Sequence, residues 1–211
     1  MTRRAPEIRL EPLVGAVVGG DSDDDVTETI LDAAVDVLAS GGLRGCTVEE
    51  VAAQARVGRT TIYRRFEGRD DLVHAVLARE VRRAFASVAA AVAHLDRPQD
   101  RLVEGILAAL EEARRSPLVA LVRTEPELVR LVTVGSGPLI DVAVSFLVEE
   151  GERSHGRMPT ERDRHTAELL VRFGVSLLLT PQGTLPLDDP DASRAALHAL
   201  LDPLVGPAAG D

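Results

Sequence analysis

Residues that can hydrogen-bond or carry positive charge are concentrated in the segment Arg59–Phe66, RTTIYRRF. In a helix, with about 100° per residue, Ile62 and Phe66 lie together on one apolar face. The remaining faces then carry hydroxyl and guanidinium groups: Thr60, Thr61, Tyr63 and Arg64. Guanidinium groups bind guanine edges and phosphates, and hydroxyl groups bind phosphate oxygens. The pattern favours a helix that contacts nucleic acid; the alternative is a surface helix whose arginines are only solvated.

No other set of reactive side chains has the spacing of a catalytic or metal-binding site. None of the 5 histidines stands at metal-ligand spacing from another: His74, His94, His155, His165 and His198. Gly135-Ser136-Gly137 follows no predicted strand, so it indicates a turn rather than a phosphate-binding loop. The sequence therefore predicts no enzymatic activity, no metal ion and no cofactor.

The charge of the chain requires any contact with nucleic acid to be local. The net charge is −10, which excludes a generally basic nucleic-acid-binding protein. A local basic patch is available from four arginines: Arg59, Arg64, Arg65 and Arg69. The single cysteine, Cys46, excludes an intrachain disulfide and indicates a reducing, cytoplasmic location. We expect Cys46 to be a small buried hydrophobe rather than a redox sensor.

The segment Arg59–Phe66 is expected to be the second of two short helices joined by a tight turn. Thr47 can cap the first helix and can form a capping box with Glu50. Apolar residues then recur at helical spacing: Val48, Val51, Ala52 and Ala55. Arg56-Val57-Gly58 interrupts this pattern and is predicted to form the turn.

A further helix is predicted before this pair. Residues 1–25 lack a sustained pattern and are expected to be a flexible tail rather than a signal peptide. Residues 26–40 carry an apolar stripe at helical spacing, which Gly41-Gly42 ends. Three helices that share one small core would keep the short second helix of the pair ordered.

The segment Thr47–Leu72 resembles the DNA-binding segment of the tetracycline-repressor (TetR) family. The matching residues stand at the family's spacing: Thr47, Ala52, Val57, Thr61, Ile62, Tyr63, Phe66, Arg69 and Leu72. The family usually has glycine where Arg56 stands, so Arg56 must adopt a turn conformation that favours glycine, or the turn shifts. The family usually has serine where Gly58 stands, and glycine is a weaker cap.

The resemblance implies an all-α protein with an N-terminal three-helix helix-turn-helix domain and a C-terminal helical ligand-binding and dimerisation domain. It also implies a dimer that reads a palindromic operator in double-stranded DNA. We expect Arg64 to make the main base contact, assisted by Thr60 and Arg59. Side chains that position phosphates are expected to be Thr47, Thr61, Tyr63 and Arg69. The alternative is a ligand-binding or protein-interaction module without sequence-specific DNA binding.

Helical patterns continue through the rest of the chain. We predict a DNA-binding domain at residues 26–69 and a regulatory and dimerisation domain at 70–211. A long helix over 70–94 would begin at the DNA-binding segment and enter the second domain, so a tilt at its far end would move the DNA-reading helix. A spacer helix without this role is the alternative. No stretch approaches the roughly 20 apolar residues of a membrane-spanning helix.

Two C-terminal helices are candidates for a homodimer interface. The helix predicted at 161–179 is apolar on nearly all sides over 169–179, except at Arg172 and Ser176. The helix predicted at 191–205 carries a leucine stripe: Leu197, Leu200, Leu201 and Leu204. A two-fold dimer would bury both helices, as in the resembled family; the alternative is an ordinary monomer core. Arg172 would then pair with an acid across the dimer or bind an anionic ligand.

The resemblance further implies a small-molecule effector, whose binding in the C-terminal domain releases the DNA. Three side chains are apolar candidates for the wall of its site: Leu107, Phe146 and Phe173. Because only 2% of the residues are aromatic, an aliphatic or flexible effector is favoured over a flat multi-ring one. The sequence thus predicts a ligand-responsive transcriptional regulator and, by resemblance, a repressor.

Overall fold

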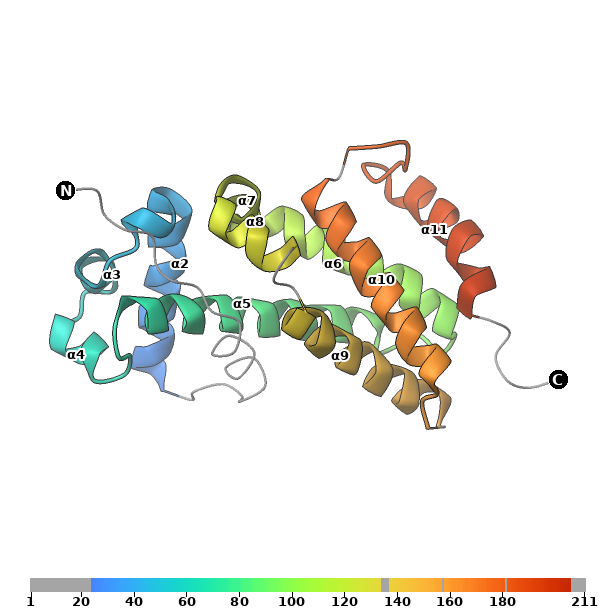
Figure 1. The fold of residues 1–211 in the computed structure, drawn as a ribbon, viewed down its shortest axis with the longest axis horizontal. Helices are drawn as coiled ribbons and strands as arrows, with labels where there is room; N and C mark the ends of the chain where they lie inside the picture. Colours follow the sequence, from blue (N-terminus) through green and yellow to red (C-terminus); the bar gives the residue numbers. More distant parts are fainter. Residues whose placement is uncertain (1–23, 134–136, 157, 181, 206–211) are drawn as a thin grey trace. The chain divides into compact units, whose positions relative to one another are not determined.

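The computed structural model describes residues 24–133, 137–156, 158–180 and 182–205, and all regular secondary structure in these ranges is helical (Figure 1). The helices are α2 Asp25–Gly45, α3 Val48–Ala55, α4 Arg59–Tyr63, α5 Arg69–Val92, α6 Pro98–Arg115, α7 Pro117–Thr124, α8 Pro126–Thr133, α9 Gly137–His155, α10 Glu161–Leu179 and α11 Pro190–Val205. The predicted all-α fold is confirmed. Among the described helices, none is long and apolar enough to span a membrane.

The chain divides into two compact units. The first unit comprises Met1–Arg83 and Ser116–Pro138, and the second comprises Ala84–Arg115 and Leu139–Asp211. The first unit therefore contains α2, α3, α4, the first part of α5, α7 and α8, while α6 belongs to the second unit. The predicted domain limits at residues 26–69 and 70–211 remain a prediction. The predicted tail lies almost entirely outside the described residues.

The core of the first unit forms because α2, α3 and α4 each bury one apolar face. α2 packs along α3, and α3 also contacts α4. The fully buried side chains come from all these helices and from the start of α5: Ile30, Leu38, Val51, Ile62, Leu72, Val73 and Val76. The predicted three-helix arrangement is thus present, and α5 supplies further apolar surface to the same core.

Two helix ends differ in detail from the prediction. α4 ends at Tyr63 rather than Phe66, although the Phe66 N–H still donates to the Ile62 carbonyl at 2.9 Å. α2 continues to Gly45, but Gly42, with φ 64° and ψ −174°, interrupts it at the predicted position. That backbone conformation is accessible essentially only to glycine, so the regular part of α2 ends there.

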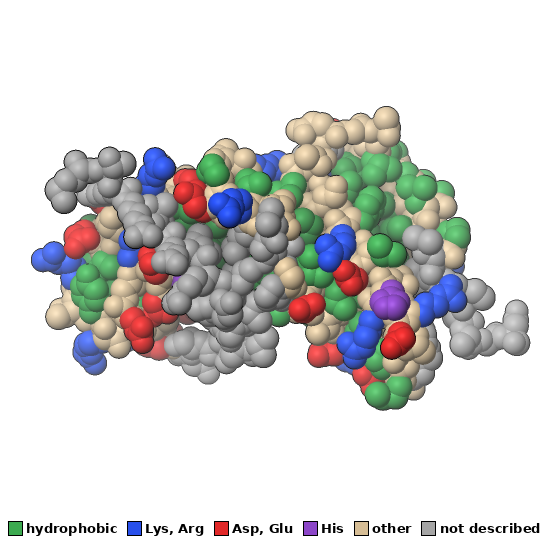
Figure 2. Space-filling model, viewed as in Figure 1, with side chains coloured by type: hydrophobic (Ala, Val, Ile, Leu, Met, Phe, Trp, Pro, Cys, Tyr) green, Lys and Arg blue, Asp and Glu red, His purple; other side chains and the backbone are tan. Residues whose placement is uncertain are grey.

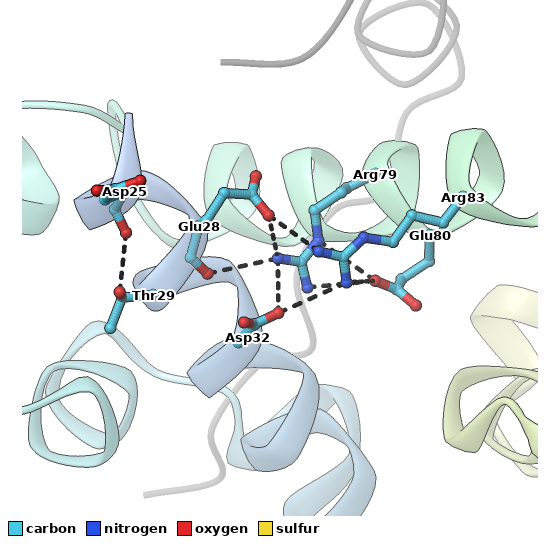
Figure 3. Close-up of polar contacts among 7 residues, drawn as sticks. All are labelled: Asp25, Glu28, Thr29, Asp32, Arg79, Glu80 and Arg83. Carbon is cyan, nitrogen blue, oxygen red and sulfur yellow. Dashed lines mark hydrogen bonds and ion pairs between the residues drawn. The ribbon is translucent and has the colours of Figure 1, made fainter. Parts of the chain in front are cut away.

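An ion network joins α2 to α5 within the first unit. Figure 3 shows Arg79 and Arg83 of α5 reaching toward Glu28 and Asp32 of α2. The Arg79 side chain is only 2% exposed, and its Nη1 atom lies 3.1 Å from Glu28 Oε2 and 2.9 Å from Asp32 Oδ1. Arg83, which is 51% exposed, shares the same carboxylates, at 3.0 Å from Glu28. Glu80 Oε1 lies 3.2 Å from Arg79 Nη2.

Because Arg79 is buried and Arg83 is exposed, we expect their removal to lower the free energy of unfolding by different amounts. Arg79→Ala leaves clustered carboxylates without their buried counter-charge, and we expect it to lower the free energy of unfolding by about 3 kcal/mol. Arg83→Ala removes the same charge from a solvated position and should cost less than about 1 kcal/mol. Urea denaturation of both variants measures the difference, and equal losses would contradict the asymmetry.

The second unit has α6 at its centre, packed against α10 and α11. Two clusters of buried side chains form its core: Val103, Leu197 and Leu201 in one, and Leu110, Leu177 and Leu187 in the other. Arg194 of α11 binds both carboxylate oxygens of Glu104 on α6. The hydrogen bond from Arg194 lowers the pKa of Glu104. Apolar packing and one bidentate ion pair therefore hold α11 against α6.

Candidate nucleic-acid interface

The outer face of α4 is exposed, as the helical spacing predicts. Ile62 is fully buried and Phe66 is 7% exposed, so both anchor the helix. The side chains on the remaining faces are exposed, apart from the half-buried Thr61: Arg59, Thr60, Tyr63 and Arg64. Tyr63 is 55% exposed, although most large hydrophobic side chains of the described residues are at least partly buried. The hydroxyl and guanidinium groups of α4 are thus available to a partner.

Thr47 lies at the start of α3 and caps it. Its Oγ1 atom accepts a hydrogen bond from the Glu50 N–H at 3.2 Å. Because the hydroxyl is the acceptor in this bond, its hydrogen can still be donated to another group. The structure confirms the predicted cap, and the cap orders the hydroxyl at the end of the helix where a negatively charged group is favoured.

The turn between α3 and α4 has the geometry that the resemblance requires. Arg56 adopts the left-handed conformation, with φ 55° and ψ 37°, and its N–H reaches the carbonyls of Ala52 and Ala53. Among the described residues, Arg56 is the only non-glycine residue with positive φ. Gly58 precedes α4 in an extended conformation without a side-chain cap, as expected. The turn therefore does not shift, and Arg56 adopts a left-handed backbone conformation that is less favourable for arginine than for glycine.

Arg65 does not contribute to the basic patch. Its Nη2 atom lies 2.6 Å from Asp24 Oδ2, and its Nε atom donates to the same oxygen and to Thr27 Oγ1. The hydrogen bond from Arg65 lowers the pKa of Asp24. The expectation that Arg65 belongs to the patch is therefore wrong. Sequence reasoning missed this pair because Asp24 lies 41 residues away among several other acids.

Arg69 uses its guanidinium group inside the protein. Its Nε and Nη2 atoms donate to the carbonyl oxygens of Cys46 and Leu43, at the end of α2. These contacts tie the start of α5 to the segment that leads into α3. Its predicted role as a phosphate contact remains a prediction.

Cys46 is buried beside this contact. It is 0% exposed, and burial raises the pKa of its thiol to about 11. A thiol with this pKa is neutral at physiological pH, and the thiolate is the reactive form. Cys46 therefore behaves as the small buried hydrophobe that was predicted.

Comparison with known proteins identifies the fold around this interface. The family described as "Bacterial regulatory proteins, tetR family" matches residues 30–76. The family described as "Bacterial Tetracyclin repressor, C-terminal domain" matches residues 98–203. The chain belongs to the TetR family. It is accordingly a helix-turn-helix transcriptional regulator, and α3 and α4 are the two helices of its DNA-binding motif.

Relatives of known sequence or structure agree with this assignment. A helix-turn-helix transcriptional regulator from Mycobacterium tuberculosis is 30% identical over 183 residues, 86% of each protein. The repressor AlkX from Dietzia sp. strain DQ12-45-1b is 28% identical, with a TM-score of 0.64 over 83% of this chain and 94% of that chain. The multidrug binding protein EbrR is 26% identical, with a TM-score of 0.57 over 84% and 96% of the two chains.

The three predicted effector-binding residues are partly buried in the second unit. Leu107 packs against the cluster of Val103 and its neighbours, and Phe173 packs against both core clusters. Phe146 stacks on Phe85, with ring centroids 5.0 Å apart. These positions suit either core packing or the wall of a ligand site, so the effector site remains a prediction.

Arg172 has a partner within its own helix. Its side chain is 55% exposed, and its Nη2 atom lies 2.7 Å from Glu168 Oε1, one turn earlier. Within the single chain Arg172 therefore pairs with Glu168, and its pairing with an acid across the dimer or with an anionic ligand remains a prediction. The (i, i+4) spacing of the two residues places them on the same face of the helix.

The left-handed conformation of Arg56 predicts a stabilising substitution. Arg56→Gly removes a cost of roughly 1–2 kcal/mol and adds backbone entropy to the unfolded chain. We expect a net gain of about 0.5 kcal/mol in the free energy of unfolding, measured by thermal or urea denaturation. Ala53→Gly, at an exposed helical position of α3, is the control and should lose about 1 kcal/mol. A loss for Arg56→Gly would show that the turn has another geometry.

Proposed function

We propose that this TetR-family protein is a ligand-responsive repressor that binds a palindromic operator as a homodimer. The observation that supports it is the exposure of Thr60 and Tyr63 on α4 and of Arg64 at its C-cap, while Ile62 and Phe66 are buried. A helix exposed in this way can enter the major groove of DNA. Arg64 is then the base contact, with Thr60 and Arg59 beside it, and Thr47, Thr61, Tyr63 and Arg69 position the phosphates.

Selection of bound DNA from a random pool tests this function most directly. We expect the recovered sequences to share a palindrome whose half-sites are separated by about one helical turn, ~34 Å, or a multiple of it. Recovery of no preferred sequence, at low salt and with folded protein, would favour the alternative of a ligand-binding or protein-interaction module without sequence-specific DNA binding.

The two neighbouring arginines that follow α4 are proposed to have different roles: Arg64 contacts DNA, and Arg65 supports the fold. Arg64→Ala should weaken binding to the selected operator by roughly 1–3 kcal/mol and relax the preference at one base position. Arg65→Ala removes the same charge but breaks the pair with Asp24, so it should mainly lower thermal stability. Fluorescence anisotropy with operator and mutated duplexes, read beside thermal melts, measures both effects.

Tyr63 provides a further check on the same face. Tyr63→Phe removes one hydroxyl and should weaken binding to all sequences alike, because phosphate contacts carry no base preference. If Arg64→Ala and Tyr63→Phe both retain full operator affinity, the assignment of the DNA-facing side of α4 is wrong.

The homodimer is proposed to form through α10 and α11. Members of the family act as dimers, and in this chain both helices carry large exposed apolar side chains: Leu169 is 70% exposed and Leu200 is 54% exposed. Figure 2 shows hydrophobic side chains gathered over α10 and α11 on the face in view. The leucine stripe of α11 is divided, because Leu197 and Leu201 are buried within the protomer. A second copy would cover the apolar surface that remains.

Dimerisation through α10 makes one exposed leucine sensitive to charge. Leu169→Glu places two carboxylates near the two-fold axis and should shift sedimentation from dimer to monomer. Met158→Glu changes another apolar residue, 75% exposed and outside both helices, and should leave the dimer intact. If sedimentation velocity shows a dimer for Leu169→Glu, this interface is not the one used.

The effector is proposed to contain a flexible aliphatic chain. Aromatic residues make up only 2% of the protein, and the AlkX repressor that it resembles is implicated in biodegradation of n-alkanes. Operator release can be measured with three probes: a straight-chain alkane, an alkanol of the same length and a planar polycyclic dye. Release by an aliphatic probe supports the proposal, and release by the dye alone contradicts it. The cytoplasm is the compartment in which such a regulator would act.

A further inference from the structure

The short segment Gly42–Cys46, which we term the α2–α3 hinge, connects the regular part of α2, which ends before Gly42, to the cap of α3. At Gly42, φ is 64° and ψ is −174°, so the chain changes direction there. Thr47, the N-cap of α3, follows the hinge directly. The direction in which α3 and α4 leave α2 therefore depends on the conformation of these few residues.

Glu125, from a distant part of the first unit, binds the amide side of the hinge. Its Oε1 atom accepts a hydrogen bond from the Leu43 N–H at 3.2 Å, across 82 residues of sequence. A Cβ atom on Gly42 would lie 2.5 Å from the same Oε1 atom. The carboxylate therefore occupies the space that the missing side chain of Gly42 leaves open.

The backbone of Glu125 is fixed by the helices on either side of it. Its N–H donates to the Leu121 carbonyl at the end of α7, at 2.9 Å. Its own carbonyl accepts from the N–H groups of Leu128 and Val129 in α8, at 3.0 Å each. Because its backbone is held in this way, the Glu125 side chain has a fixed starting position from which to hold the hinge.

The carbonyl side of the hinge is held by the opposite charge. Arg69 donates to the carbonyls of Leu43 and Cys46, so Leu43 has an anion at its N–H and a cation at its C=O. Each charge matches the polarity of the group that it binds, and charge-assisted hydrogen bonds are stronger than neutral ones. Leu43 itself is fully buried. The hinge is thus fixed from two sides by side chains of two other elements.

We propose that Glu125 is a positioning residue for DNA binding, which holds the α2–α3 hinge in the conformation that presents α4 to the duplex. The inference rests on the proposed DNA-binding function. It also gives α7 and α8 a role, because Glu125 lies between these two helices and its backbone is bonded to both.

Removal of the carboxylate, with a matched control, tests the proposal. Glu125→Ala and Glu127→Ala each delete one negative charge, and Glu127 is exposed two residues away. Loss of an acid alone strengthens attraction to DNA, so Glu127→Ala should bind the selected operator as tightly as the wild type or slightly more tightly. Glu125→Ala should bind about tenfold more weakly at a temperature where it is fully folded. Glu125→Gln keeps an oxygen acceptor and should recover part of this loss.

Hydrogen exchange of the Leu43 amide, without DNA, provides an independent measurement. Exchange should be faster in Glu125→Ala than in the wild type or Glu127→Ala. Faster exchange with unchanged operator affinity would reduce Glu125 to a local stabilising contact and overturn the proposal, and unchanged exchange would exclude the contact itself. If the wild type binds no duplex, the proposed function fails and the positioning role fails with it, while exchange still reports whether Glu125 holds the hinge.

Discussion

The structure depends on the fact that a helix as short as α4 cannot be stable by itself. Its formation costs more conformational entropy than its few hydrogen bonds return. Burial of Ile62 and Phe66 in the first unit supplies the stabilisation that the local sequence lacks. The residues that follow α4 are also tied down, because Arg65 binds Asp24 and the Glu67 N–H donates to Asp71 at 2.9 Å. The exposed face of α4 is thereby ordered by contacts on the other side of the same segment.

Arginine serves two purposes in this acidic protein, and the environment decides between them. Arg65, Arg69 and Arg79 turn inward and bind carboxylates or backbone carbonyls that belong to other helices. Arg59 on α4 and Arg64 at its C-cap remain exposed, although Arg59 Nη1 lies 3.6 Å from Glu49 Oε1. The exposed basic patch of this acidic chain is therefore small.

The second unit has buried apolar clusters inside and a few exposed apolar side chains on α10 and α11. α6 buries its apolar side chains against α10 and α11, and the pair of Glu104 and Arg194 secures the contact. Leu169 and Leu200 remain exposed on the outer surfaces of the same two helices. This division explains why a helix that is apolar on nearly all sides is still only partly buried in one protomer. The rest of its surface suits a second copy of the chain.

Sequence alone determined the helices and the division of α4 into an exposed and a buried face, because periodicity, caps and breakers act over a few residues. The Thr47 cap, the turn at Arg56 and the buried face of Ile62 and Phe66 all follow from local spacing. Tertiary structure decided which arginines are available, since Asp24 lies far from Arg65 in the sequence and neither residue type is specific to such a pair. It likewise decided that Glu125 binds the Leu43 amide. Every non-proline residue has a backbone N–H, so the sequence does not indicate which distant acid will accept a hydrogen bond from a particular one.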